Sequence, residues 1–146
     1  MNHAIAVRLS LRTCAVAIVA VSLGACTERA TNPANALPYG YVDAPRAGDV
    51  LRPGKTLVGG WALDDSRVAE IRVFLDGHYR ASAPIAVPRP DVAKAFPQCG
   101  RQQNICGFNL LVDFGMAAGE HIVLVQAIDD YGASRDIGAI PVVIPR

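Results

Sequence analysis

The 146-residue sequence has little of what catalysis or nucleic-acid binding usually requires. It contains three histidines, and it has no G-x-S-x-G, H-E-x-x-H or P-loop pattern. Basic and acidic residues nearly balance, at 14 Lys plus Arg against 13 Asp plus Glu, so no charge excess would attract a phosphate backbone. An uncharged apolar run of about 20 residues, which a membrane-spanning helix needs, is also missing. These absences argue against motif-bearing enzymes, a nucleic-acid partner and a spanning helix.

The first 25 residues have the composition of a targeting segment. His3, Arg8 and Arg12 form a basic start, and the apolar stretch from Cys14 to Leu23 has about ten residues, inside the range of a signal peptide's apolar region. Removal of this segment leaves 12 of the 14 basic residues against 13 acidic ones, a net charge of −1. We therefore exclude residues 1–25 from the prediction of the fold.

The targeting segment ends in Val21-Ser22-Leu23-Gly24-Ala25-Cys26, which resembles a bacterial lipobox. The resemblance implies that a lipoprotein signal peptidase recognises Leu23, Gly24 and Ala25, and that Cys26 becomes the lipidated first residue of the mature protein. It implies a membrane partner through the N-terminal lipid. The alternative is an ordinary signal peptide that leaves a soluble secreted protein. An exposed unpaired thiol would be an oxidation liability there, which favours lipidation.

The segment after Cys26 is rich in Thr, Asn, Ala and Pro and has no apolar periodicity. Such a composition does not bury enough surface to order itself, so residues 26–38 are predicted to be a lipidated tether before a domain at residues 39–146. Thr27 is not aspartate, which by resemblance to enterobacterial sorting implies a place in the cell envelope at the outer membrane.

Two cysteines remain in the mature domain, Cys99 and Cys106. An exported protein meets oxidising conditions, so we expect them to form a disulfide. Half of a metal site is the alternative, but Pro97–Phe108 offers neither a second CxxC pair nor a histidine.

Beyond Tyr39, short apolar stretches separated by Gly, Pro and Asp predict an all-β domain. One helix is predicted at Pro90–Phe96, because Pro90 and Asp91 suit a first helical turn and Pro97 should end it. The strands are predicted at Gly40–Ala44, Thr56–Leu63, Ala69–Asp76, His78–Ala83, Phe108–Phe114, His121–Asp129 and Ile137–Ile144.

Alternation within these strands predicts which side chains face the core. Ala69, Ile71, Val73 and Leu75 share one face and are the expected core residues. The strand from His121 is apolar on both faces and should be central, whereas Pro141 indicates that the last strand lies at an edge or is bulged at that point.

Seven strands with one long excursion predict an antiparallel β-sandwich. The domain resembles the bacterial immunoglobulin-like domains of secreted and surface proteins over about Tyr39–Arg146. That family contains spacers, adhesion modules and accessory binding modules, so the resemblance implies a fold more than a function. It rests on Gly40-Tyr41-Val42-Asp43-Ala44-Pro45, Gly59-Gly60-Trp61-Ala62-Leu63-Asp64-Asp65, Val73-Phe74-Leu75-Asp76-Gly77, Arg89-Pro90-Asp91-Val92, Gly119-Glu120-His121 and Ala127-Ile128-Asp129.

Four aspartates follow two of the predicted strands: Asp64, Asp65, Asp129 and Asp130. In an immunoglobulin-like sandwich these loops lie at the same end, so the carboxylates are a candidate calcium site, and calcium is the only cofactor considered. An arginine follows each pair, so turn capping with arginine pairing explains the same residues without a metal.

The aromatic residues Trp61, Phe74, Tyr79 and Tyr131 are a candidate sugar platform. We expect instead that Trp61 lies in the sandwich core. Alternation turns Phe74 outward, and the predicted helix at Pro90–Phe96 is expected to cover it.

The excursion at Ser82–Gly107 contains the expected disulfide and displays Arg101, Gln102, Gln103 and Asn104 between the two cysteines. A crosslinked loop loses little entropy on association, so these four residues are the candidate partner-binding tip. The alternative is a stapled loop that serves stability alone.

Catalysis has little support, and His121 is expected to be a core or boundary residue. An enzyme would need His78 or His121 beside a carboxylate in a cleft. The sequence therefore favours a lipid-anchored, non-catalytic interaction or accessory module with an envelope protein or glycan as partner. Alternatives are an inhibitor of a muralytic enzyme such as lysozyme, whose loop residue plugs the enzyme's cleft, and a glycan-binding module.

Overall fold

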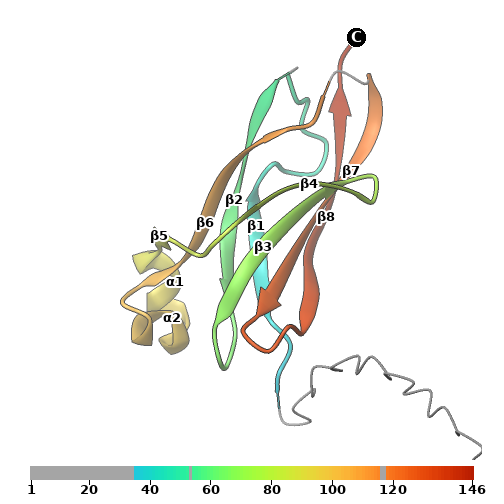
Figure 1. Cartoon of the computed structure of the whole chain (residues 1–146). Helices are drawn as coiled ribbons and strands as arrows, with labels where there is room; N and C mark the ends of the chain where they lie inside the picture. Colours follow the sequence, from blue (N-terminus) through green and yellow to red (C-terminus); the bar gives the residue numbers. More distant parts are fainter. Residues whose placement is uncertain (1–34, 53, 116–117) are drawn as a thin grey trace, which may run out of the picture.

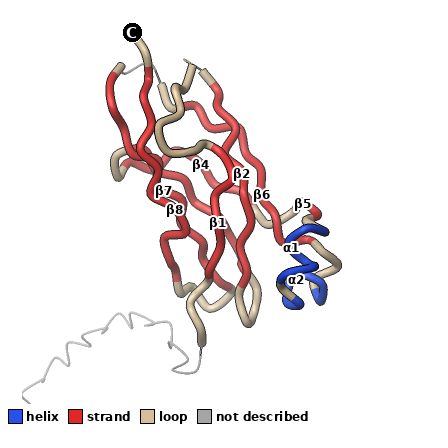
Figure 2. Tube along the Cα trace, turned by 180° about the vertical axis from the view of Figure 1, so that it is seen from behind, coloured by secondary structure: helices blue, strands red, loops and turns tan. Residues whose placement is uncertain are grey.

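The computed structural model describes residues 35–52, 54–115 and 118–146. The targeting segment, Cys26 and the tether before Asn35 lie outside the described residues. The described chain forms a two-layer sandwich of β-strands with a small helical excursion on one side (Figures 1 and 2). Its elements are β1 (Tyr39–Ala44), β2 (Lys55–Leu63), β3 (Val68–Leu75), β4 (His78–Ala83), β5 (Val87–Pro88), α1 (Pro90–Ala95), α2 (Pro97–Arg101), β6 (Ile105–Asp113), β7 (Gly119–Asp129) and β8 (Ser134–Ile144).

The two sheets have the strand orders β1-β2-β6-β5 and β4-β3-β7-β8, and neighbouring strands in each are antiparallel. The predicted immunoglobulin-like antiparallel sandwich is thus confirmed, and each of the seven predicted strands is present. The two-residue strand β5 and the helix α2 were not predicted. The predicted helix is present as α1, which ends at Ala95 because Phe96 before Pro97 is extended; Pro97 then starts the separate helix α2, where a proline without an N–H is tolerated.

The core lies between the sheets and follows the alternation of the strands. Ile71, Val73 and Leu75 are buried as predicted. Ala69 is exposed, so its predicted core position is wrong. A register shift between Val68 and Glu70 makes Ala69 the extra residue of a β-bulge, and Val68 is buried in its place.

The predicted positions of the last two strands are confirmed. β7 pairs with β3 and β8 and is therefore central, and β8 is an edge strand. The segment before β2 covers part of this edge, since the Gly48 N–H donates to the Pro141 carbonyl at 2.8 Å and the Leu51 N–H to the Val143 carbonyl at 2.8 Å.

A second apolar cluster lies on the outer face of the β1-β2-β6-β5 sheet, under α1 and α2. Its buried members are Leu63, Val92, Cys99 and Cys106, and Trp61 packs against them with two other aromatic rings. The expectation of Trp61 in the sandwich core is therefore wrong. A Cβ at the neighbouring Gly60 would lie 2.9 Å from Phe108 Cζ, so the Phe108 ring fills the core at this point and Trp61 faces the other way.

The chain enters the sandwich at the end that carries the β2–β3 and β7–β8 loops (Figure 1). Asn35 Nδ2 donates to Asp129 Oδ2 at 2.5 Å, and Pro38 is fully buried. Residues of the predicted tether thus already contact the domain at this end. No helix in the described ranges is long and apolar enough to cross a membrane.

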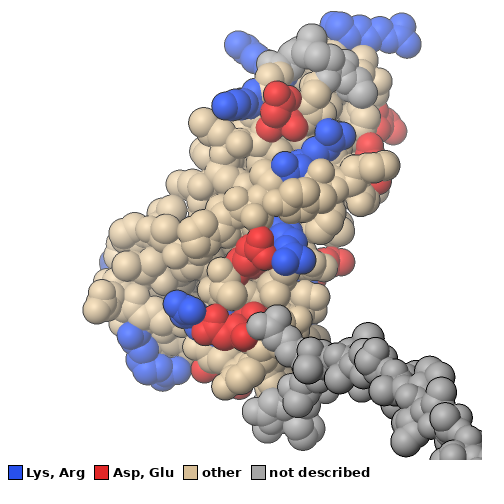
Figure 3. All heavy atoms as spheres, viewed as in Figure 1, with Lys and Arg blue, Asp and Glu red and all other residues tan. Residues whose placement is uncertain are grey.

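Charges of both signs are interspersed over the face shown in Figure 3, without a large patch of one sign. This distribution agrees with the balanced charge count and offers no continuous basic track on that face.

Candidate functional site

The residues predicted for partner binding form a tight turn between α2 and β6. Gln103 and Asn104 have φ angles of 57° and 64°, in the left-handed region, and the Asn104 N–H donates to the Cys99 carbonyl at 3.0 Å. Arg101, Gln103 and Asn104 are exposed, and Gln102 is half-buried. The turn therefore displays polar side chains as expected, on a backbone that is closed by its own hydrogen bonds.

The predicted disulfide between Cys99 and Cys106 is confirmed. The two Cα atoms lie 5.6 Å apart, and both residues are 0% exposed. They pack with Leu63 and Val92 in the outer apolar cluster. The buried disulfide thus joins the two ends of the turn, and the polar side chains of the turn face solvent.

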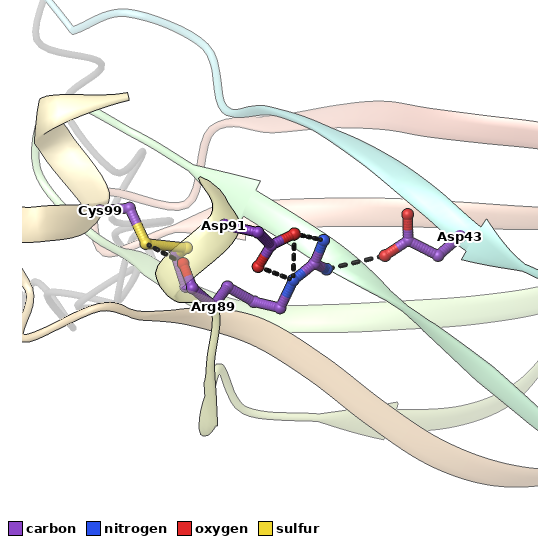
Figure 4. Close-up of polar contacts among 5 residues, drawn as sticks. Asp43, Arg89, Asp91 and Cys99 are labelled. Atoms are coloured by element: carbon purple, nitrogen blue, oxygen red, sulfur yellow. Dashed lines mark hydrogen bonds and ion pairs between the residues drawn. A yellow bond between two sulfur atoms is a disulfide. The ribbon is translucent and has the colours of Figure 1, made fainter. Parts of the chain in front are cut away.

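Arg89 ties this turn to the sheet (Figure 4). Its Nη1 donates to Asp43 Oδ2 at 2.7 Å, and its Nε and Nη2 donate to the Asp91 carboxylate at 2.9 and 2.7 Å. The Arg89 backbone N–H donates to the Asn104 carbonyl at 2.6 Å, and its carbonyl oxygen lies 3.7 Å from Cys99 Sγ. One residue thereby joins β1, α1 and the turn.

The charges of this network support one another. The hydrogen bond from Arg89 lowers the pKa of Asp91 to about 2. In turn, the hydrogen bond to Asp91, and to a smaller degree the one to Asp43, raises the pKa of Arg89. The Arg89 side chain is only 19% exposed because it lies against Gly107. A Cβ at Gly107 would lie 2.8 Å from Arg89 Cγ, so glycine provides the space that this side chain occupies.

An open pocket of about 590 Å³ lies beside the turn. It brings three of the four predicted tip residues together with parts of the chain far from them in sequence, and Asn104 does not line it. The lining consists of Arg67, Val68, Ala69, Pro84, Ile85, Arg101, Gln102, Gln103 and Ile105.

Two guanidinium groups give the pocket its polar character. Arg67 donates to Asp130 from Nε at 3.0 Å and from Nη2 at 3.1 Å, whereas the Arg101 side chain makes no hydrogen bond or ion pair with the described residues. Guanidinium and amide donors suit a planar anion such as a carboxylate. Sequence reasoning missed Arg67 as a site residue, because Arg67 precedes β3 in one sheet and the turn precedes β6 in the other, so only the packing of the two sheets brings them together.

The four aspartates considered for calcium lie in two loops that meet at one end, as expected. The Asp130 N–H donates to the Arg67 carbonyl at 3.0 Å, which joins the loops. Asp129 Oδ1 accepts the N–H groups of Tyr131 and Ala133, both at 2.8 Å. These contacts, together with the ion pair between Arg67 and Asp130, are the turn capping and arginine pairing of the metal-free alternative.

Asp64 differs from Asp129 in having an unsatisfied oxygen. Its Oδ1 accepts from Ser66 N at 2.9 Å and Ser66 Oγ at 2.6 Å, but its buried Oδ2 has no partner, and burial raises its pKa. Asp65 is exposed. Within the described ranges, no group of three or more His, Cys, Asp or Glu residues could hold a metal ion. Calcium binding stays a prediction without geometric support.

The predicted aromatic residues do not form a row. Trp61 is half-buried, with its ring centroid 5.0 Å from that of Phe96. Phe74 lies on the other sheet and makes an edge contact with Tyr79 at 5.9 Å. The expectation that the helix covers Phe74 is wrong, because α1 packs on the sheet that contains Trp61. Tyr131 is 50% exposed on the β7–β8 loop.

A histidine lies beside a carboxylate in a second pocket. His121 Nδ1 is 2.6 Å from Asp76 Oδ2, and Asp76 Oδ1 accepts the Ile122 N–H at 2.9 Å. The hydrogen bond from His121 is the main cause that lowers the pKa of Asp76. The side chain of His121 is 13% exposed, as expected for a boundary residue. The lining of the pocket contains no Ser, Thr, Cys, Lys or Tyr side chain.

No protein-family model and no curated protein matches the sequence. Among solved structures, the chain is similar to the fibronectin(III)-like modules of Clostridium thermocellum CbhA, with 16% identity and a TM-score of 0.52. The similarity covers 75% of this chain and 47% of that one, so the chain spans about half of its length. CopC from Methylosinus trichosporium OB3b is 14% identical over 73% of this chain and 93% of its own, with a TM-score of 0.39. The fibronectin(III)-like neighbour agrees with the immunoglobulin-like sandwich and indicates the fold alone.

Proposed function

We propose that this protein is a lipid-anchored, non-catalytic binding module of the bacterial cell envelope that holds a partner at the pocket beside the disulfide turn. The observation that carries the proposal is the convergence of Arg67, Arg101, Gln102 and Gln103 on one pocket. The turn is held by a buried disulfide and by the bonds of Arg89, so little conformational freedom is lost when a partner binds.

The lining of the pocket indicates the chemistry of the partner. Arg101 has no partner within the described protein and offers a planar fork of donors, which matches a carboxylate in two-point contact. Pro84 and Ile85 add an apolar side to the same pocket. A protein segment with an exposed Asp or Glu side chain or a terminal carboxylate provides both features.

Anchoring through Cys26 would keep this pocket close to the membrane. Nine positions separate Cys26 from Asn35, and even a fully extended chain of that length spans only about 30 Å. Asn35 contacts the end of the sandwich to which Arg67 also belongs. Tethering at this short range raises the local concentration of envelope partners, so a modest pocket is sufficient.

Titration of the mature chain with small carboxylates tests the pocket. We expect N-acetylglutamate, added to 15N-labelled protein that carries Cys26→Ser for solubility, to shift the amide signals of residues 67 and 101–103. N-acetylglutamine should not shift them, because it lacks the side-chain carboxylate. Arg101→Ser should abolish the response, whereas Arg80→Ser, an exposed arginine of β4 outside the pocket, should leave it intact. Equal responses to both ligands, or none to either, would refute the proposed chemistry.

Palmitate labelling tests the anchor. The full-length protein should incorporate labelled fatty acid and remain with the membrane fraction, and a Cys26→Ser variant should do neither. Release of the unlabelled wild-type protein into the soluble fraction would contradict lipidation and support the ordinary signal peptide.

The inhibitor alternative uses the same turn and is tested separately. Inhibition of a lysozyme by the wild-type chain that is lost on replacing residues 101–104 with glycine and serine would make the partner a muralytic enzyme. Binding of a carboxylate without inhibition of such enzymes would count against this alternative.

One observation favours glycan binding as a second candidate function. Tyr41 is 60% exposed on the outer face of its sheet and lies directly across from Trp61 in the β1–β2 pairing. An exposed ring beside polar groups is able to stack on a sugar. Loss of binding to peptidoglycan fragments in Tyr41→Ala, with Tyr79→Ala on the other sheet as the matched control, would support it. Equal binding by both variants would argue against this face.

A further inference from the structure

The second pocket has the size and composition of a ligand site, and nothing above assigns it a function. Its volume is about 550 Å³, within the range of small-molecule sites. It lies toward the β3–β4 turn, at the end of the sandwich away from the entry of the chain (Figure 1). It does not overlap the pocket beside the disulfide turn, because the two share no lining residue.

One side of this pocket is acidic. Asp76 is fixed by His121 Nδ1 at 2.6 Å and by the Ile122 N–H at 2.9 Å. Its backbone, with φ of 50°, starts the tight turn completed by Gly77. Glu120 lines the pocket, is exposed, and has no hydrogen bond or ion pair within the described ranges. The lining includes no Lys or Arg that would neutralise these carboxylates.

The pocket also has an apolar part. Ile122 is 52% exposed and Val143 is 37% exposed, with Pro141 between them in the lining. Pro141 is the cross-strand neighbour of Ile122 in the β7–β8 pairing, so these side chains form one continuous surface. Glu120 lies directly across from Val143 in the same pairing, so an occupant meets this aliphatic surface together with a carboxylate beside it.

We propose that this pocket binds an aliphatic primary ammonium group. The positive nitrogen would lie against Asp76 and Glu120, and the attached methylene chain would cover Ile122 and Val143. A metal ion fits less well, because it needs several close ligands and no three His, Cys, Asp or Glu residues in the described part of the chain are placed to hold one. His121 acts as a positioning residue that holds the Asp76 carboxylate in place.

The experiment uses the mature chain with Cys26→Ser, labelled with 15N, and n-butylammonium chloride as the probe. We expect saturable shifts of the amide signals of residues 76, 120–122 and 141–143, with a dissociation constant in the millimolar range. n-Butanol and sodium butyrate, which match the probe in chain length, should give less than a tenth of the affinity. Equal affinity for n-butanol, or the absence of saturation with the ammonium, overturns the proposal.

Three variants separate binding from folding. Glu120→Gln removes one charge from an exposed side chain without a bonded partner and should weaken binding at least fivefold. Asp136→Asn removes the same charge from a residue of β8 outside the pocket, keeps an acceptor for Gln126, and should leave binding unchanged. Arg101→Ser should also leave the binding of n-butylammonium unchanged, so a negative result at one pocket does not bear on the proposal for the other. Equal weakening by Glu120→Gln and Asp136→Asn would reduce the effect to overall charge and overturn the site.

The same titration identifies the source of the ammonium group. An uncharged pentapeptide with one central lysine, acetylated and amidated at its ends, presents the group as a protein would. Tighter binding of this peptide than of n-butylammonium assigns the pocket to a lysine side chain of a protein partner, and weaker binding assigns it to a free small amine.

Discussion

Removal of the disulfide tests whether the candidate site is rigid before a partner arrives. The bond joins Cys99 and Cys106 at a sequence separation of 7, so it closes a very short loop. For a loop of eight residues, the chain-entropy model gives about 2.5 kcal/mol of stabilisation at 25 °C. Both cysteines are 0% exposed, so truncation to alanine also removes packing worth roughly 1 kcal/mol. The double variant Cys99→Ala with Cys106→Ala should therefore lose about 3 to 4 kcal/mol of unfolding free energy.

The protein carries its own probe for this measurement. Trp61 is the single tryptophan, and it packs in the cluster that contains the disulfide. Its fluorescence reports on the excursion, while far-ultraviolet circular dichroism reports on the two sheets. In urea at pH 7, with Cys26→Ser in both proteins, both signals should move to a lower midpoint by roughly 2 M, given m values of about 1–3 kcal/mol per M.

Two results would refute this reasoning. A loss below about 1 kcal/mol would mean that the bonds of Arg89, and not the crosslink, hold the turn. A Trp61 transition well below the transition of the sheets in the wild-type protein would mean that the excursion unfolds separately and does not present a rigid turn.

Further variants test the contacts around the disulfide turn and in the β2–β3 and β7–β8 loops. Gly107→Ala should lower the unfolding free energy by about 1–3 kcal/mol, because the added Cβ would lie against the Arg89 side chain. The control is Gly100→Ala in α2, whose Cβ would meet nothing within 4 Å and which should slightly raise the unfolding free energy. Equal effects of the two variants in urea unfolding would contradict the close approach. The pKa of Asp91 is lowered from 3.8 to about 2, so the ionised carboxylate stabilises the folded protein above about pH 4, and this contribution is lost as the pH falls toward 2. In Asp91→Asn, the unfolding free energy should therefore change less with pH between about 4 and 2. A pH profile identical to that of the wild-type protein would refute the pairing. Asp129→Asn should lower the unfolding free energy by about 1–3 kcal/mol, because both carboxylate oxygens of Asp129 accept hydrogen bonds. Asp64→Asn should lower it by less than about 0.5 kcal/mol, because one oxygen of Asp64 has no partner. The reverse order of the two variants in thermal unfolding would contradict these hydrogen bonds.

Local alternation was sufficient to predict most of the sandwich. Each predicted strand is present because its apolar residues recur with the period of a half-buried sheet. It failed at Ala69, because a bulge shifts the phase of β3 and leaves no local signal in a run of apolar residues. The expectation for Trp61 came from the fold, which commonly buries one tryptophan, and it failed because the Phe108 ring fills the core from the neighbouring strand.

The candidate site was predictable only in part. Cysteine spacing identified the disulfide and the polar residues between its ends, since both are local in sequence. Arg67 and the contact between Arg89 and Asp43 were not predictable, because they join segments brought together by the pairing of the sheets. The pairing of His121 with Asp76 is likewise long-range and depends on the register of β3 with β7.

The path of the chain decides which pocket would face an anchor at Cys26. Asn35 bonds to Asp129, the last residue of β7, whereas Asp76 follows the opposite end of the neighbouring strand β3. The pocket with Arg67 therefore lies toward the tether, and the pocket with Asp76 lies away from it. Because the tether spans at most about 30 Å, an anchor at Cys26 would restrict the first pocket to partners near the membrane. A partner of the second pocket would then approach from the far side, so the two proposals predict that both pockets can be occupied together.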